Sequence, residues 1–322
     1  MAKFLVTGGA GFIGSHVSER LLAQGHAVTI LDDLNDFYDP ELKRGNLAEI
    51  SRAGSARFHP LDICDESRVL DVFGKTRPDI VIHLAARAGV RPSLEQPLLY
   101  ERVNIHGTMV LLEACRAFGA PKFVFASSSS VYGIADHVPF REDDNGVMPI
   151  SPYAATKIAG EKICYTYSHL YGIKASCLRF FTVFGPRQRP DLAIRKFTGM
   201  IDRGEALPMF GDGSTARDYT YIDDIVTGIL AAAQLDSPFD VFNLGNSTPV
   251  SLSEMIRTIE ECLGKKAILR QMPLQPGDVP ITYADIAKAE RMLGYRPATS
   301  FADGVAQFVR WYRRPARAAV SV

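Results

Sequence analysis

The chain has no excess charge of either sign. Its 322 residues hold 36 lysines and arginines against 36 aspartates and glutamates, so the formal net charge is zero. A balanced charge gives no long-range attraction to nucleic acid or to an anionic membrane, and we expect neither as a partner. An anionic small ligand must therefore be met by local arginines.

Cysteines are few, and long apolar runs are absent. The five cysteines are odd in number and show no Cys-x-x-Cys spacing, which predicts reduced, packed side chains, no metal site and a cytoplasmic location. An apolar strand begins at Lys3 and leaves no room for a signal peptide, and no apolar run reaches the ~20 residues of a membrane helix. Because 47% of the residues are hydrophobic, we expect one large or two modest globular domains.

What is present begins with a glycine-rich turn between a strand and a helix. The order is strand, glycines, amphipathic helix, strand and acid: Lys3–Thr7, Gly8/Gly11/Gly14, Ser15–Gln24, Ala27–Leu31 and Asp32. Such glycines allow a tight turn and close approach of the backbone to a pyrophosphate at the helix N-terminus, where free N–H groups favour an anion. Asp32 is placed to take the adenosine ribose hydroxyls. The pattern therefore predicts a dinucleotide site.

Apolar strands and helical patterns alternate through the first half of the chain. We expect strands at 57–61, 79–84, 122–126 and 174–179, and helices at 67–74, 98–118 and 153–171. This alternation predicts an α/β fold with a Rossmann-type, doubly wound parallel sheet. Ligands bind at the carboxyl ends of such strands, so residues 62–63, 83–87, 127–130 and 181–182 should surround one crevice.

Beyond about residue 179, prolines and glycines become frequent, which indicates a smaller α/β domain that covers a substrate. We divide the chain into a dinucleotide-binding domain, 1–180, and a substrate-binding domain, 181–322. The segment 223–252, with a helix at 223–234 and a strand at 240–244, is expected to return to the main sheet.

Tyr153 and Lys157 are the candidate catalytic pair. A spacing of four residues places them on one face of a helix, where the ammonium should lower the pKa of the phenol. A serine of the run Ser127–Ser130 beside that pair could hold a substrate oxygen. A base, a nearby cation and an oxygen-holding hydroxyl are the groups needed to oxidise an alcohol. Other readings remain open: the pair occurs by chance in many helices, the serines can be turn or cap residues, and His83 can simply satisfy a core hydrogen bond.

Taken together, these motifs resemble the extended short-chain dehydrogenase/reductase superfamily, specifically its nucleotide-sugar epimerases, from Lys3 to about Tyr312. The matching positions are Gly8/Gly11/Gly14, Asp32, Asp62, His83-Leu84-Ala85-Ala86, Asn104, Ser128, Tyr153, Lys157, Arg217-Asp218-Tyr219, Asp223-Asp224 and Pro276-Gly277-Asp278.

The resemblance implies that Tyr153 is the general base, Lys157 its electrostatic tuner and a ribose ligand, and Ser128 the oxygen holder. It implies tightly held NAD, a UDP-sugar substrate, a transient 4-keto sugar, and a homodimer formed through the helices at 98–118 and 153–171. Asp32 favours NAD over NADP because a carboxylate would repel a 2′-phosphate. The implied cofactor contacts are Gly8, Gly11, Phe12, Ile13, Gly14, Asp32, Asp33, Asn35, Asp62, Ile63, Leu84, Ala85, Ala86, Arg87, Asn104, Ser127, Tyr153, Lys157, Phe180 and Val183.

Two departures narrow the substrate. Nucleotide-sugar dehydratases carry an Asp-Glu pair where this chain has Ser129-Ser130, which disfavours dehydration. UDP-glucose 4-epimerases and UDP-glucuronate decarboxylases usually carry Asn at the position of Thr182. The stretches 35–39, 182–193 and 275–278 resemble UDP-glucuronate 4-epimerases instead.

A uronate carboxylate needs its own ligands, because a 4-keto uronate is a β-keto acid that loses carbon dioxide easily. Our hypothesis is that Thr182 and Arg189 bind that carboxylate. The implied substrate contacts are Arg91, Ser128, Ser129, Thr182, Arg189, Leu192, Phe197, Met209, Phe210, Arg217 and Asp278. UDP-glucose epimerisation, uronate decarboxylation and a catalytically silent NAD-binding regulator remain the alternatives.

Overall fold

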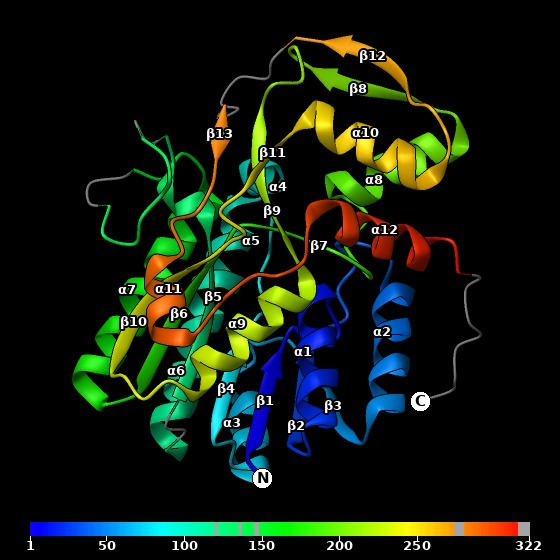
Figure 1. Cartoon of the computed structure of the whole chain (residues 1–322). Helices are drawn as coiled ribbons and strands as arrows, with labels where there is room; N and C mark the ends of the chain where they lie inside the picture. The colour runs from blue at the N-terminus through cyan, green and yellow to red at the C-terminus, as the bar shows by residue number, and fades with distance from the viewer. Residues whose placement is uncertain (120–121, 135–136, 145–147, 274–279, 315–322) are drawn as a thin grey trace.

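A seven-stranded parallel sheet forms the centre of the larger part of the molecule. The computed structural model of the chain describes residues 1–119, 122–134, 137–144, 148–273 and 280–314. The strand order is β10-β6-β5-β4-β1-β2-β3. From β1, the chain adds strands first on one side (β2, β3) and then on the other (β4, β5, β6), which confirms the Rossmann-type sheet (Figure 1). The strands are β1 (Lys3–Thr7), β2 (Ala27–Asp32), β3 (Ala56–Pro60), β4 (Ile80–His83), β5 (Lys122–Ser128), β6 (Lys174–Phe180) and β10 (Phe239–Leu244).

The strands are apolar on both faces because helices cover both. In β1, Phe4 and Val6 belong to one hydrophobic core, whereas Leu5 belongs to the other, as the two-residue period of a strand requires. The first core is covered by α1 (Phe12–Ala23) and α9 (Ile222–Gln234), flanked by α2 (Pro40–Ala53) and α11 (Ala287–Leu293). The second is covered by α3 (Glu66–Thr76), α6 (Gly107–Phe118) and α7 (Pro152–Tyr171).

A smaller unit lies beyond the carboxyl ends of the large sheet (Figure 1). Its sheets are β7 (Thr182–Phe184), β9 (Ala216–Tyr221), β11 (Pro249–Ser251) and β13 (Ile281–Thr282), and the pair β8 (Ala206–Phe210) and β12 (Ile268–Met272). Its helices are α8 (Ala193–Arg203), α10 (Leu252–Leu263) and α12 (Phe301–Tyr312). Of the segment 223–252, α9 and β10 do lie in the large unit, but β11 pairs with β9 in the smaller one, which corrects the end of that segment.

The single helix expected at 98–118 is wrong. The chain forms α5 (Pro97–Glu101), a π-helical turn at Arg102–His106 and then α6. This wider turn contains Asn104, whose side chain bonds to Arg87 and Thr156, outside its own helix. In the first half of the chain, α2 and α4 (Val90–Glu95) were not expected. In the second half only α9 was expected, whereas α8, α10, α11 and α12 were not. Within the described ranges, every helix is too short or too polar to cross a membrane.

Candidate active site

A pocket opens at the carboxyl ends of the central strands. The strand-end segments expected to meet do line it together: Asp62-Ile63, Leu84–Arg87, Ser127–Ser130 and Phe181-Thr182. Tyr153 and Lys157 enter from α7, and Arg189 enters from the loop before α8. Parallel strands therefore bring residues more than a hundred positions apart to one wall.

The glycine-rich turn fits a bound pyrophosphate. Gly8 has φ +65°, and a Cβ on Gly14 would lie 2.2 Å from the Gly8 carbonyl oxygen, so neither position accepts a side chain. Gly11 is the N-cap of α1 and has no side chain to cap it, which leaves first-turn N–H groups for an anion. A Cβ on Gly11 would meet only the Gly8 oxygen, at 3.1 Å, because this residue faces the open pocket.

Asp32 lies at the pocket wall beside a partner that the sequence did not predict. Its carboxylate accepts from the N–H groups of Ala10 (3.2 Å) and Leu34 (2.9 Å) and pairs with Lys43 of α2 at 3.5 Å. Burial raises the pKa of Asp32, and the Lys43 charge opposes this rise. Both residues line the pocket at the end suited to a ribose. Asp39 before Pro40 is a helix-start signal that would have placed α2 and thus Lys43.

Asn104 holds the loop after β4 through two hydrogen bonds to the backbone of Arg87. Arg87 donates its N–H to the Asn104 side chain (2.8 Å) and accepts from the Asn104 amide at its own carbonyl (3.0 Å). The same amide donates to Thr156, whose hydroxyl donates to the Tyr153 carbonyl. Asn104 was expected to contact the cofactor, but it lies beneath the wall, 2% exposed, and does not line the pocket. It holds the wall and the catalytic helix in register instead.

His83 is a structural histidine. The Thr108 hydroxyl donates to the Asn104 carbonyl (2.6 Å), so it accepts from His83 Nε2–H at 3.0 Å. Nδ1 then accepts from the Thr7 hydroxyl at 2.7 Å. Burial lowers the pKa of His83 to about 3, so the ring stays neutral at physiological pH. This agrees with the core hydrogen bond considered above rather than with proton transfer.

Ser128, Tyr153 and Lys157, the candidate catalytic residues, all line the pocket. Lys157 Nζ donates to the Ala126 carbonyl at 2.7 Å and lies 5.9 Å from the centre of the Tyr153 ring. Burial raises the pKa of Tyr153, whereas a hydrogen bond from Ser128 and the charge of Arg189 lower it. Burial also lowers the pKa of Lys157 to about 8. Ser128 and Arg189 are thus the two groups seen to oppose the rise in the pKa of Tyr153, and an effect of Lys157 on this pKa stays a prediction.

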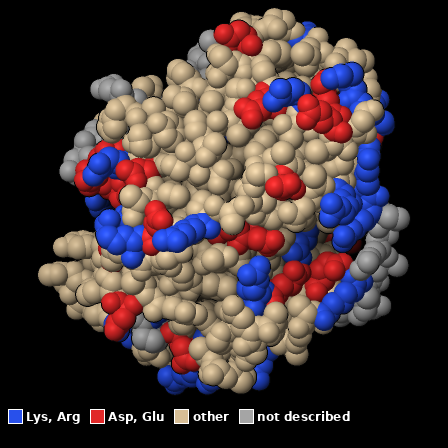
Figure 2. Space-filling model, viewed as in Figure 1, with Lys and Arg blue, Asp and Glu red and all other residues tan. Residues whose placement is uncertain are grey.

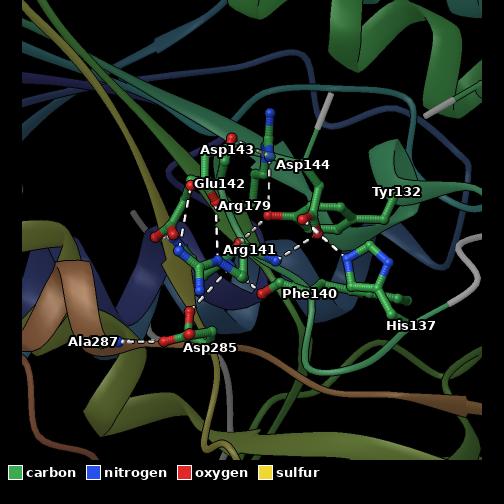
Figure 3. A network of polar contacts seen from close by, with 11 residues as sticks. Tyr132, His137, Phe140, Arg141, Glu142, Asp143, Asp144, Arg179, Asp285 and Ala287 are labelled. Carbon is green, nitrogen blue, oxygen red and sulfur yellow. Dashed lines mark hydrogen bonds and ion pairs between the residues drawn. The ribbon is translucent and has the colours of Figure 1, made fainter. Parts of the chain in front are cut away.

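A buried ion pair supports the catalytic strand from behind. Glu161 of α7 accepts two hydrogen bonds from the Arg179 guanidinium, both at 2.9 Å, and one from Ser127 at 2.5 Å. Arg179 also donates to the Tyr132 hydroxyl at 2.9 Å (Figure 3). Figure 3 shows this contact beside Phe140 and Glu142, so the network ties β6 to the segment that follows the serines. Ser127, expected to touch the cofactor, lines the pocket and anchors this network.

An Arg–Asp pair faces the catalytic tyrosine. The Arg189 side chain is 18% exposed, and its guanidinium donates to Asp191 from Nε (3.0 Å) and Nη2 (2.8 Å). Its Cζ lies 5.4 Å from the centre of the Phe37 ring. Thr182 and Leu192 also line the pocket near Arg189.

Of the predicted cofactor contacts, all but Asn104 line the pocket. Among the predicted substrate contacts, Ser128, Ser129, Thr182, Arg189 and Leu192 do. Five do not: Arg91 of α4, and four residues of the smaller unit, Phe197, Met209, Phe210 and Arg217. Asp278 lies outside the described residues, as does the stretch 275–278. Lining residues that were not predicted include Phe37, Tyr38 and Lys43.

Comparison with known proteins agrees with this arrangement. The sequence profile of the GDP-mannose 4,6-dehydratase family matches residues 5–308. A UDP-glucuronate 4-epimerase of Thermodesulfobacterium geofontis is 44% identical, covering 97% of this chain and 96% of its own length.

Two solved structures are similarly close. UDP-glucuronic acid 4-epimerase from Bacillus cereus, in complex with UDP-glucuronic acid and NAD, has a TM-score of 0.89 at 36% identity and covers 96% of this chain and 98% of its own. UDP-glucose 4-epimerase from Thermotoga maritima, with UDP-glucose, also has a TM-score of 0.89, at 35% identity over 97% and 98% of the chains. Because the scores are equal, the backbone does not separate uronate from hexose substrates, and the side chains in the pocket must.

Proposed function

Because the chain belongs to the GDP-mannose 4,6-dehydratase family of extended short-chain dehydrogenases/reductases, we propose that it is an NAD-dependent UDP-glucuronate 4-epimerase. It interconverts UDP-glucuronate and UDP-galacturonate through a 4-keto sugar. One observation carries the proposal: a single pocket is lined by the glycine turn, by Ser128, Tyr153 and Lys157, and by two residues suited to a carboxylate. These two are Thr182, which offers a hydroxyl, and Arg189, which offers a positive charge.

NAD fits the first half of this pocket and supplies the acceptor of the substrate hydride when bound. The first turn of α1 and Gly11 would hold the pyrophosphate. Asp32, with Lys43 beside it, would hold the adenosine ribose. The buried Arg87 Nε has no hydrogen-bond partner among the described residues, as expected for a group that meets a bound ligand.

Tyr153 removes the proton from the 4-hydroxyl of the sugar, and Ser128 holds the same oxygen. The hydrogen bond from Ser128 and the charge of Arg189 stabilise the phenolate that acts as base. Lys157 holds its ammonium against the carboxyl end of β5, where it would also be a ligand for the ribose of the cofactor. Once the 4-keto sugar has turned over and C4 receives the hydride on its opposite face, Tyr153 returns the proton to the C4 oxygen.

The carboxylate of the substrate must be restrained while C4 is a ketone. Loss of carbon dioxide requires the C5–carboxylate bond to stand perpendicular to the carbonyl, and a two-sided grip by Thr182 and Arg189 prevents this alignment. Neither Ser129 nor Ser130 is acidic, which disfavours the water elimination that dehydratases perform.

The decisive experiment is to incubate the purified protein with UDP-glucuronate and with UDP-glucose separately and to identify the products by NMR. We expect UDP-galacturonate from the first substrate without carbon dioxide release. A pentose product would show a decarboxylase, and turnover of UDP-glucose alone would show the hexose epimerase. Tyr153→Phe separates an enzyme from an NAD-binding regulator, because a regulator keeps its biological activity in this variant.

Arg189→Ala tests the carboxylate ligand. We expect a larger loss with UDP-glucuronate than with UDP-glucose, since only the first carries a carboxylate. An equal loss with both would remove Arg189 from uronate recognition.

The nucleotide end of the substrate extends into the smaller unit. By resemblance, Arg217 of β9 contacts the phosphates and Met209 and Phe210 of β8 contact the base. Asp278 is proposed for the ribose. Loss of UDP-sugar affinity in Arg217→Ala, with NAD binding retained, is the expected result.

We further propose a cytoplasmic homodimer. The exposed apolar side chains Leu98, Met109 and Tyr165 lie along α5, α6 and α7, the segment expected to form the dimer contact. All five cysteines are free thiols, which suits a reducing compartment. On the face shown in Figure 2, Lys/Arg and Asp/Glu side chains gather in small mixed groups between broad areas of other residues. Sedimentation as a monomer at micromolar concentration would refute the dimer.

A further inference from the structure

The short turn that carries Arg189 has its own design. Arg189-Pro190-Asp191-Leu192 closes through a hydrogen bond from the Leu192 N–H to the Arg189 carbonyl, 3.2 Å long. Proline at the second position pre-sets this turn, which brings the side chains of residues 189 and 191 to the same side. The pairing of Arg189 with Asp191 is therefore local and is built into the sequence Arg-Pro-Asp.

Asp191 occupies only one edge of the guanidinium. It accepts from Nε and Nη2, the side-on edge. A guanidinium carries five N–H donors, so three remain, including both on Nη1. Arg189 lines the pocket whereas Asp191 does not, and the Asp191 side chain is 44% exposed against 18% for Arg189. The carboxylate thus grips the arginine from the solvent side.

Phe37 restrains the same group from another direction. Its ring centre lies 5.4 Å from Arg189 Cζ, within the range of a cation–π contact, and the ring belongs to the loop after β2. One edge and one face of the guanidinium are thereby fixed, each by a different part of the chain. The Nη1 end is the part of the guanidinium that neither residue holds. The charge of this guanidinium lowers the pKa of Tyr153, so Arg189 acts at the same place as the candidate base.

We propose that Asp191 is a positioning residue for uronate recognition: with Phe37, it orients the Arg189 guanidinium so that the Nη1 end, which Asp191 does not take, meets the substrate carboxylate. This inference rests on the proposed function, in which the substrate is a uronate. Asp191 does not touch the substrate. It acts by keeping a long, rotatable side chain in one orientation before the substrate arrives, so the carboxylate is restrained as soon as C4 is oxidised.

The test is Asp191→Asn in the NAD-loaded enzyme, assayed with UDP-glucuronate and UDP-glucose. Asparagine keeps the size of the side chain but removes its charge and weakens the two hydrogen bonds to Arg189. The guanidinium should then shift, and a shift of ~1 Å should lower kcat/KM for the uronate about 10- to 100-fold. The rate with UDP-glucose, or its Kd where turnover is too slow, should change less than about threefold on the same reasoning. The fraction of uronate lost as carbon dioxide should rise, a readout that a general structural defect does not move. Phe37→Leu should shift both quantities in the same direction, and Asp191→Glu should restore part of the uronate rate.

Glu205→Gln is the matched control. Arg203 and Glu205 form the same pair two residues apart, at 2.6 and 3.0 Å, but on an exposed surface away from the pocket lining. This variant should leave both substrates unaffected.

Two failures can be told apart. If the wild-type enzyme does not epimerise UDP-glucuronate, the proposed function fails. If it does, and Asp191→Asn keeps the same preference for uronate over hexose or tightens uronate binding, the positioning role fails while the function stands. Tighter binding would mean that Asp191 competes with the substrate carboxylate.

Discussion

Lys157 offers a test of how burial affects stability. Its side chain is 4% exposed, and burial lowers its pKa from 10.5 to about 8. A tenfold change in proton affinity is worth about 1.4 kcal/mol, so keeping the ammonium in the folded protein at pH 7 disfavours folding by about 3 kcal/mol. Lys157→Met removes this charge and keeps an unbranched side chain of similar length. It also loses the hydrogen bond to the Ala126 carbonyl, worth about 1 kcal/mol.

The variant should therefore be inactive yet more stable than the wild type by about 2 kcal/mol at pH 7. The sign depends on pH. Between pH 8 and 10.5 the unfolded chain binds a proton on Lys157 that the folded chain has lost, so the free energy of unfolding of the wild type rises with pH. Lys157→Met lacks this rise. Its advantage should shrink through this window and reverse at about pH 10.

Urea unfolding of NAD-free protein at pH 7, 8.5 and 10 measures the difference; bound NAD would stabilise the wild type selectively. Lys122 provides the control, because it is equally buried, its pKa is also lowered to about 8, and it lies outside the pocket lining. Lys122→Met should follow the same pH trend while keeping its activity. A stability difference for Lys157→Met that stays the same at pH 7 and pH 10 would refute the reasoning.

Three further outcomes are expected. Gly14→Ala should destabilise the fold itself, because its Cβ would lie 2.2 Å from a backbone oxygen, whereas Gly11→Ala should keep the fold and weaken NAD binding, as thermal unfolding and NAD titration would show. Glu161→Ala leaves the Arg179 guanidinium, 13% exposed, without its carboxylate, and urea unfolding should show a loss of about 3–5 kcal/mol. Thr182→Val should raise carbon dioxide release from UDP-glucuronate while leaving turnover of UDP-glucose nearly unchanged, measured by trapping the gas.

Each of these has a clear contrary result. Equal NAD affinity in Gly11→Ala and the wild type would mean that the pyrophosphate does not pass over this residue. A loss below about 1 kcal/mol for Glu161→Ala, typical of an exposed pair, would mean that water reaches Arg179. Unchanged carbon dioxide release in Thr182→Val would exclude its hydroxyl from holding the carboxylate.

Local pattern was enough to predict the large sheet. Alternating apolar strands and helices are properties of short segments, and the parallel arrangement then places every strand end on one edge. The pocket lining at Leu84–Arg87 and Ser127–Ser130 follows from that rule alone. The helix at 153–171 was also predicted closely, since Ser151 caps it and Gly172 ends it.

Long-range contacts were beyond the same reasoning. Nothing near residue 104 in the sequence indicates that an amide must reach Arg87 and Thr156, and this reach accompanies the π-helical turn. The electrostatics of Tyr153 depend in the same way on Arg189, which folding brings from 36 positions away in a different unit.

The sequence by itself thus determined the sheet, the glycine turn and the Tyr153/Lys157 pair, because each rests on spacing within one segment or on the common direction of parallel strands. The tertiary structure alone decided which charges face one another: Lys43 beside Asp32, Glu161 beneath Ser127, and the Phe37 ring against Arg189. The physical reason is that electrostatic interaction depends on distance and burial in space, and neither is written in the order of the residues.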